Sequence, residues 1–112
     1  MNIEELTILC KKLPSVTEDI KWGNDLCFCV GGKMFCVAPL TLPFTVSFKV
    51  KDDEFDELST SVGIIPAPYA ARNKWVQVTD VKVFKKKEWE HYVTQSYNLV
   101  KSKLPKKVQE KL

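Results

Sequence analysis

Helical periodicity marks both ends of the chain. Near the start, apolar residues recur every three or four positions until Pro14, and near the end a similar stripe follows Lys85–Lys87 and stops at Pro105. Residues at this spacing share one face of a helix, so both stripes predict amphipathic helices. The inward positions are Ile3, Leu6, Leu9, Cys10 and Leu13 in the first helix, and Trp89, Val93, Ser96 or Tyr97, Val100 and Leu104 in the last.

Between the helices, Leu26–Val37 holds two short β-prone runs separated by two glycines. A two-residue Gly-Gly connection predicts a hairpin with a primed turn, because both positions can take positive φ. Folding the runs about this turn pairs Phe28 with Phe35 and Cys27 with Cys36. The two phenylalanines are expected on one face of the sheet and the sulfur-bearing side chains on the other.

The remaining segments complete a predicted order of elements. Residues 44–50 alternate between apolar and polar side chains and predict a third strand, whereas 75–78 predict a fourth. A short helix is expected over 55–62, and 15–24 and 64–71 are expected as connecting chain. The predicted order is α-β-β-β-α-β-α, an α+β fold with helices packed on one face of an antiparallel sheet. Five residues are expected to be buried together in its core: Phe28, Phe35, Phe48, Trp89 and Val93.

Composition sets the broad class of the protein. The 112 residues, 45% hydrophobic and 28% charged, are typical of one globular domain spanning 1–112. No apolar run approaches a membrane span and no secretory signal is visible, so a cytoplasmic location is expected. Residues 1–60 carry six basic and ten acidic side chains (−4), and 61–112 carry eleven basic and four acidic ones (+7). A basic half is compatible with an anionic partner, although a solvated lysine-rich helix gives the same composition.

The four cysteines do not follow a zinc pattern. Structural zinc sites use paired ligands with two to four residues between them, whereas Cys27 and Cys29 have a single residue between them and spread along a strand with Cys36 opposite. A fourth ligand would have to be distant Cys10 or the lone His91. We therefore expect reduced thiols, no metal, no cofactor and no cysteine–histidine catalytic pair.

Two sets of residues are candidates for binding. Cations at turns and strand edges suit contacts with phosphates, and exposed aromatic rings can stack on bases. The candidate nucleic-acid-binding residues are Lys33, Lys49, Arg72, Asn73 and Lys74. The candidate cleft for a small ligand or a protein is formed by Trp22, Tyr69 and Trp75, although buried structural roles for the tryptophans remain open.

An ordered series of short motifs extends over nearly the whole chain. It comprises Glu18, Trp22-Gly23, Val30–Phe35, Val46–Lys49, Pro66–Tyr69, Lys74–Val76, Ser96–Val100 and Leu104–Lys107. In this order the motifs resemble the MmcQ/YjbR family of small bacterial proteins. The resemblance implies a frataxin-like (CyaY-like) two-layer sandwich and a double wing arrangement from which DNA binding has been suggested. It brings no established catalytic residues, and frataxin-like iron binding does not transfer, because the acidic residues cluster in 52–57 rather than on the first helix.

Together these observations predict a non-enzymatic, cytoplasmic, monomeric module that binds DNA through a basic surface. The alternative is a domain that binds a protein or small ligand in the cleft around Trp22, Tyr69 and Trp75. Salt separates the two, since phosphate contacts weaken steeply with ionic strength and apolar contacts do not.

Overall fold

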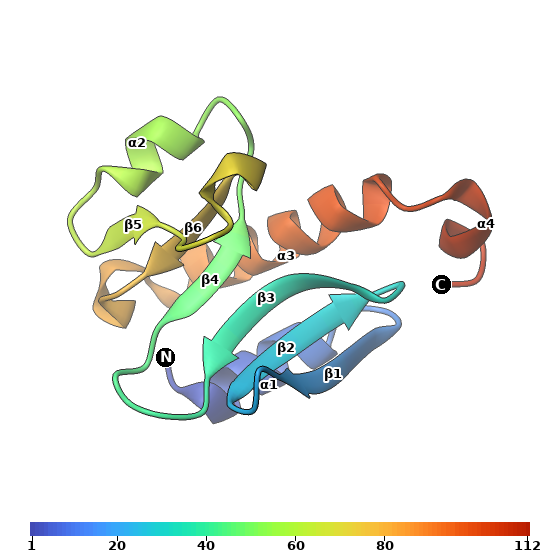
Figure 1. Cartoon of the computed structure of the whole chain (residues 1–112), viewed down its shortest axis with the longest axis horizontal. Helices are drawn as coiled ribbons and strands as arrows, with labels where there is room; N and C mark the ends of the chain where they lie inside the picture. The colour runs from blue at the N-terminus through green and yellow to red at the C-terminus, as the bar shows by residue number, and fades with distance from the viewer.

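The computed structural model describes all residues, 1–112, as a six-stranded antiparallel sheet with helices (Figure 1). The strand order is β1-β2-β3-β4-β6-β5, and this arrangement confirms the α+β class. The elements in chain order are α1 (Ile3–Lys11), β1 (Val16–Lys21), β2 (Asp25–Val30), β3 (Lys33–Pro39), β4 (Val46–Lys49), α2 (Phe55–Ser59), β5 (Ile64–Pro66), η1 (Ala71–Asn73), β6 (Trp75–Val78), η2 (Val81–Val83), α3 (Lys86–Ser102) and α4 (Lys106–Gln109).

The predicted order of elements lacks two strands and the short helix α4. Residues expected as connecting chain form β1 and β5, which are the two edges of the sheet. β1 lacks an alternating apolar face because most of its side chains are exposed, and β5 is only three residues long and ends in Pro66. Edge strands with one free side carry a weak sequence signal, so pairing with a neighbour decides them.

Helices α1 and α3 lie behind the strands in Figure 1, and α3 contacts β2, β3 and β4. The five core residues predicted from the sequence all belong to one buried cluster beneath these helices. The register places the side chains of the other face on the side away from α3, and we call this side the open face. Its residues include Asp25, Cys27 and Cys29 of β2, Met34, Val37 and Pro39 of β3, Ser47 and Lys49 of β4, and Trp75 and Gln77 of β6.

A β-bulge changes the predicted register of the hairpin. Gly31 and Gly32 have φ of 57° and 81°, as a primed turn requires, and the first two pairs beyond the turn are as predicted. The register then shifts, so that Phe28 lies opposite Cys36 and not Phe35. Cys27 consequently lies opposite Val37, and the predicted Cys27–Cys36 pair is wrong. The extra residue in β3 moves Cys36 to the helix-covered face.

A buried hydroxyl from α3 supports this bulge. Ser96 is fully buried, and its Oγ donates to the carbonyl of Phe35 at 2.6 Å and accepts from the backbone N–H of Lys49 at 2.9 Å. The two residues belong to β3 and β4, where only two residue pairs are formed. Ser96 therefore bridges two strands whose own ladder is short, and leaves neither backbone group unpaired.

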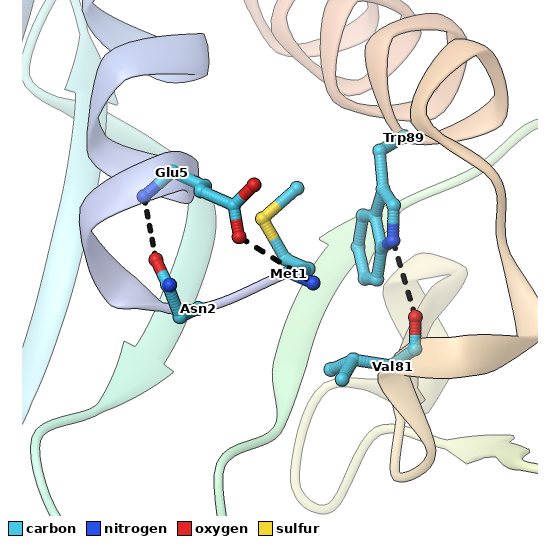
Figure 2. A network of polar contacts seen from close by, with 5 residues as sticks. All are labelled: Met1, Asn2, Glu5, Val81 and Trp89. Atoms are coloured by element: carbon cyan, nitrogen blue, oxygen red, sulfur yellow. Dashed lines mark hydrogen bonds and ion pairs between the residues drawn. The ribbon is translucent and has the colours of Figure 1, made fainter.

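Polar contacts fix both helices at their first turns (Figure 2). The side chain of Asn2 caps α1 by accepting from the N–H of Glu5 at 2.8 Å. In α3 the indole N–H of Trp89 donates to the carbonyl of Val81 at 3.3 Å, which leaves its ring packed edge-on against Phe48. The helices are thereby held against one face of the sheet, and the open face has no helix of its own.

Candidate functional site: a groove on the open face

The open face carries a groove of about 850 Å³. β3, β4 and β6 supply its floor, and the turns that follow β1 and β5 contribute to its walls. Half of the lining residues are hydrophobic, and the three candidate cleft residues Trp22, Tyr69 and Trp75 all line it. The structure therefore gathers in one groove aromatic side chains from two distant segments of the sequence, Trp22 from one and Tyr69 and Trp75 from the other.

Trp22 lies in the turn between β1 and β2. The N–H of Asn24 donates to the carbonyl of Lys21 at 3.2 Å, and Trp22 and Gly23 have φ of 52° and 78°, as a type I′ turn requires. Asn, Asp or Gly normally occupies the Trp22 position, because left-handed backbone costs a bulky residue about 1–2 kcal/mol. The side chain is 71% exposed, so little core packing offsets this cost.

Tyr69 lies in an equivalent situation on the other flank of the sheet. The N–H of Ala70 donates to the carbonyl of Ala67 at 3.2 Å, with Pro68 and Tyr69 at the two central positions. Tyr69 has φ of 65°, where a type II turn favours Gly or Asn, and its side chain is fully exposed. Two aromatic residues thus occupy unfavourable turn positions, and both of them line the groove.

The third aromatic residue, Trp75, begins β6 and is half-buried. None of the three groove rings is paired with another aromatic ring, in contrast to the core, where Phe48, Phe84 and Trp89 contact one another. The exposed rings of Trp22 and Tyr69 are therefore available to a flat ligand.

The floor of the groove is divided into an apolar and a polar half. One row across the sheet runs from Val37 on β3 through Ser47 on β4 to Gln77 on β6. Thr45 and Asn73 add further polar groups to the lining. None of these four polar side chains forms a hydrogen bond within the protein. They are free to bond a ligand, and the signal for Thr45 and Ser47 in the sequence was the polar alternation of residues 45–49.

Charge in the lining comes from a single residue, the carboxylate of Asp25. Two cations of the predicted nucleic-acid set, Lys49 and Arg72, lie beside the groove instead. Lys49 is the cross-strand neighbour of Trp75, and its ammonium donates to the carbonyl of Asn73. Arg72 is exposed on η1 and forms no ion pair. One end of the groove is thus flanked by cations.

Two members of the predicted set are placed less favourably. The ammonium of Lys74 lies over the ring of Phe55, 5.0 Å from its centroid, and so already has a partner. Lys33 pairs with Val30, so the register places it on the helix-covered side rather than the open face. The structure therefore brings Lys49, Arg72 and Asn73 to one end of the groove and leaves Lys33 apart from them.

Lys49 experiences an electropositive environment. Burial, followed by the neighbouring charges of Lys103 and Lys74, lowers the pKa of Lys49, and Asp52 opposes this only in part. The ammonium group of Lys49 lacks a carboxylate partner within ion-pair distance. An anion bound at this end of the groove would relieve the repulsion.

The cysteines are all unpaired and buried. Cys10 of α1 meets Cys36 of β3 in the core, and a hydrogen bond with Cys36 together with burial raises the pKa of Cys10. Burial also raises the pKa of Cys27 to about 11 and raises that of Cys29. The raised pKa values of Cys10, Cys27 and Cys29 disfavour the thiolate form and make these three thiols poor nucleophiles.

Other regions offer less organised chemistry. His91 lines an open depression on the outer side of α3, where only one of the eight lining residues is hydrophobic. No three metal-ligating side chains gather at one place. None of the helices has the length and apolar character needed to cross a membrane. The open-face groove is accordingly the strongest candidate site.

Comparison with known proteins gives a consistent picture of the fold. The model of the YjbR family matches residues 11–99. The crystal structure of the Deinococcus radiodurans protein DR2400, a DUF419 domain, is 24% identical and superposes with a TM-score of 0.87 over 98% of this chain and 86% of its own. A crystal structure of a Pseudomonas syringae protein is 17% identical, with a TM-score of 0.73 over 88% of this chain and 98% of its own. At these identities the likeness concerns the fold alone, and no curated protein matches the sequence.

Proposed function

The chain belongs to the YjbR family, and from that premise we propose a non-enzymatic binding module whose site is the open-face groove and whose ligand is single-stranded nucleic acid. The family gives no activity to carry over, so the proposal rests on the site. Its fold, which we expect to be CyaY-like, is a scaffold for many functions.

One observation carries the proposal: Trp22 and Tyr69 are exposed aromatic residues in left-handed turn positions, and both line the same groove. Residues in such positions cost stability, and strain of this kind concentrates at binding sites. Aromatic side chains that stand apart on a sheet surface suit successive unstacked bases, each of which can stack on one ring.

The charges next to the groove favour a polyanion over a neutral chain. Lys49 and Arg72 flank the end that holds Trp75 and Asn73, and neither is neutralised by a carboxylate. A nucleic-acid strand whose bases enter the groove would place its phosphates beside Lys49 and Arg72. A duplex hides its bases, so it would use the cations without the aromatic rings.

The alternative is a small flat ligand or a protein segment bound by the same aromatic residues. The apolar half of the floor and the absence of cations from the lining itself favour this function. The two candidates differ in their dependence on salt and on Arg72, so one set of measurements separates them. The monomeric state and the cytoplasmic location stay predictions.

The test is a titration of a fluorescein-labelled DNA strand of about eight nucleotides, followed by anisotropy over a range of salt concentrations. We expect binding at low salt, with log affinity falling by roughly 0.7 per phosphate contact for each unit of log salt concentration. Trp22→Ala should weaken binding at every salt concentration, and Arg72→Ala should flatten the salt dependence by about 0.7.

Val62→Ala is the matched control, because Val62 is also an exposed apolar residue (92%) but lies outside the groove. It should bind like the wild-type protein. Absence of binding at tens of micromolar protein, or binding that Trp22→Ala leaves unchanged, would contradict the proposal. Binding that is insensitive to salt and to Arg72→Ala would favour the alternative ligand.

A further inference from the structure

The polar half of the groove floor lies within reach of any base that stacks on Trp75. Trp75 and Gln77 are two residues apart on β6 and therefore project from the same face. Side chains at this spacing stand roughly 6–7 Å apart, which is about the width of a nucleobase. A base against the Trp75 ring can thus turn one edge toward the carboxamide of Gln77.

Gln77 has a hydrogen-bonding neighbour on the adjacent strand. Ser47 lies directly opposite Gln77, and the Cβ atoms of such cross-strand pairs are about 4.5–5.5 Å apart. Both side chains are half-buried, both line the groove and neither bonds to another protein group. A carboxamide presents a donor and an acceptor side by side, which is the pattern found on the edge of every nucleobase.

The other cross-strand neighbours of this pair are apolar on both sides. Val37 of β3 flanks Ser47 on one side, and Ile65 of β5 flanks Gln77 on the other. Hydrogen-bonding groups therefore occupy the middle of the row and apolar groups its two ends. Such a row accepts a flat ring on its apolar parts and bonds the edge of that ring at its centre.

From this geometry we propose that Gln77, assisted by Ser47, reads the hydrogen-bonding edge of one nucleobase in the groove. The inference rests on the proposed function and adds a specificity-determining residue to it. The carboxamide can rotate to match the donor–acceptor order of any base, so the wild-type protein should discriminate weakly among bases. A carboxylate at the same position accepts only, and guanine alone offers two adjacent donors on its pairing edge.

The test compares two labelled strands of about eight nucleotides, one of adenine alone and one alternating adenine and guanine. Their affinities are measured for the wild-type protein, Gln77→Glu and Gln77→Leu. We expect Gln77→Glu to shift the affinity ratio toward the guanine-containing strand by about tenfold, in line with the discrimination of one bidentate contact. Gln77→Leu should weaken both strands and leave the ratio unchanged.

A new carboxylate repels the phosphates of both strands alike, so this repulsion cancels in the ratio of the two affinities. Asn98→Asp is the matched control, since it makes the same amide-to-carboxylate change on the outer side of α3, away from the groove. It should leave the ratio as in the wild-type protein. If both strands bind and Gln77→Glu does not change the ratio, the role of Gln77 is refuted while the groove remains a binding site. If neither strand binds to the wild-type protein, the proposed function itself is refuted.

Discussion

Replacement of Ser96 by alanine tests how the sheet is held together at the bulge. The Oγ of Ser96 is the partner of the Phe35 carbonyl at 2.6 Å and of the Lys49 N–H at 2.9 Å. Alanine removes both hydrogen bonds and supplies no other group. Since Ser96 is fully buried, water cannot replace the hydroxyl without rearrangement of the helix–sheet contact.

The magnitude follows from the two backbone groups left behind. A buried polar group that loses its partner costs about 1–3 kcal/mol, and the Lys49 N–H, which is only partly buried, belongs at the lower end. We therefore expect Ser96→Ala to lower the free energy of unfolding by roughly 2–4 kcal/mol. For a domain of this size, 1 kcal/mol corresponds to roughly 4 °C, so the melting temperature should fall by about 8–16 °C.

Urea and thermal unfolding, followed by circular dichroism, measure the change. Ser102→Ala is the matched control, because its exposed hydroxyl on the same helix bonds only to the carbonyl of Leu99. It should change stability by no more than about 0.5 kcal/mol. If Ser96→Ala is as stable as Ser102→Ala, the hydroxyl does not bridge β3 and β4, and the reasoning is wrong.

Three further variants test the turn, the core and the thiols. Tyr69→Asn should leave stability unchanged or raise it by up to about 1 kcal/mol, because asparagine tolerates positive φ and the Tyr69 side chain is fully exposed. The same variant should weaken ligand binding in the groove. A loss of stability in urea unfolding would show that the Tyr69 ring has a structural role. Phe35→Ala should lower the free energy of unfolding by about 3–5 kcal/mol in the same assay, since the ring is fully buried and packs edge-on against Tyr97. An unchanged unfolding midpoint would place Phe35 outside the core. The pKa of Cys27 rises from 9.0 to about 11 on folding, so the folded state favours the protonated thiol; its contribution is fully present below pH 9 and is lost as pH rises toward 11. Cys27→Ala should flatten the fall in stability across this window, and equal slopes for the two proteins would contradict the shift.

Local signals were sufficient for much of the fold. The Gly-Gly turn, the two long amphipathic stripes and the alternation in β4 all correspond to observed elements, because each depends on residues that are close in sequence. The buried cluster was predicted for the same reason, since periodicity determines which side chains share a face. The ordered motifs were enough to identify the YjbR family.

The errors came from pairing between segments, which the pattern of a single segment does not record. β1 is a strand because β2 pairs with it along six residues, although its own side chains are mostly exposed. At the bulge in β3, the carbonyl of Phe35 accepts a hydrogen bond from Ser96, which lies 61 residues further along the chain. No local pattern reports such a partner, so the predicted pairing of Cys27 with Cys36 was wrong.

The candidate site shows the same division. The sequence by itself determined that Trp22, Tyr69 and Trp75 exist, that Lys49 lies on a polar strand face and that Trp22 and Tyr69 lie in connecting chain. Only the tertiary structure decided that these two segments reach one groove from different flanks of the sheet, and that Lys33 lies on the other face. The physical reason is that strand order and register are set by which edges pair across the whole chain, whereas each strand and turn is set by its own few residues.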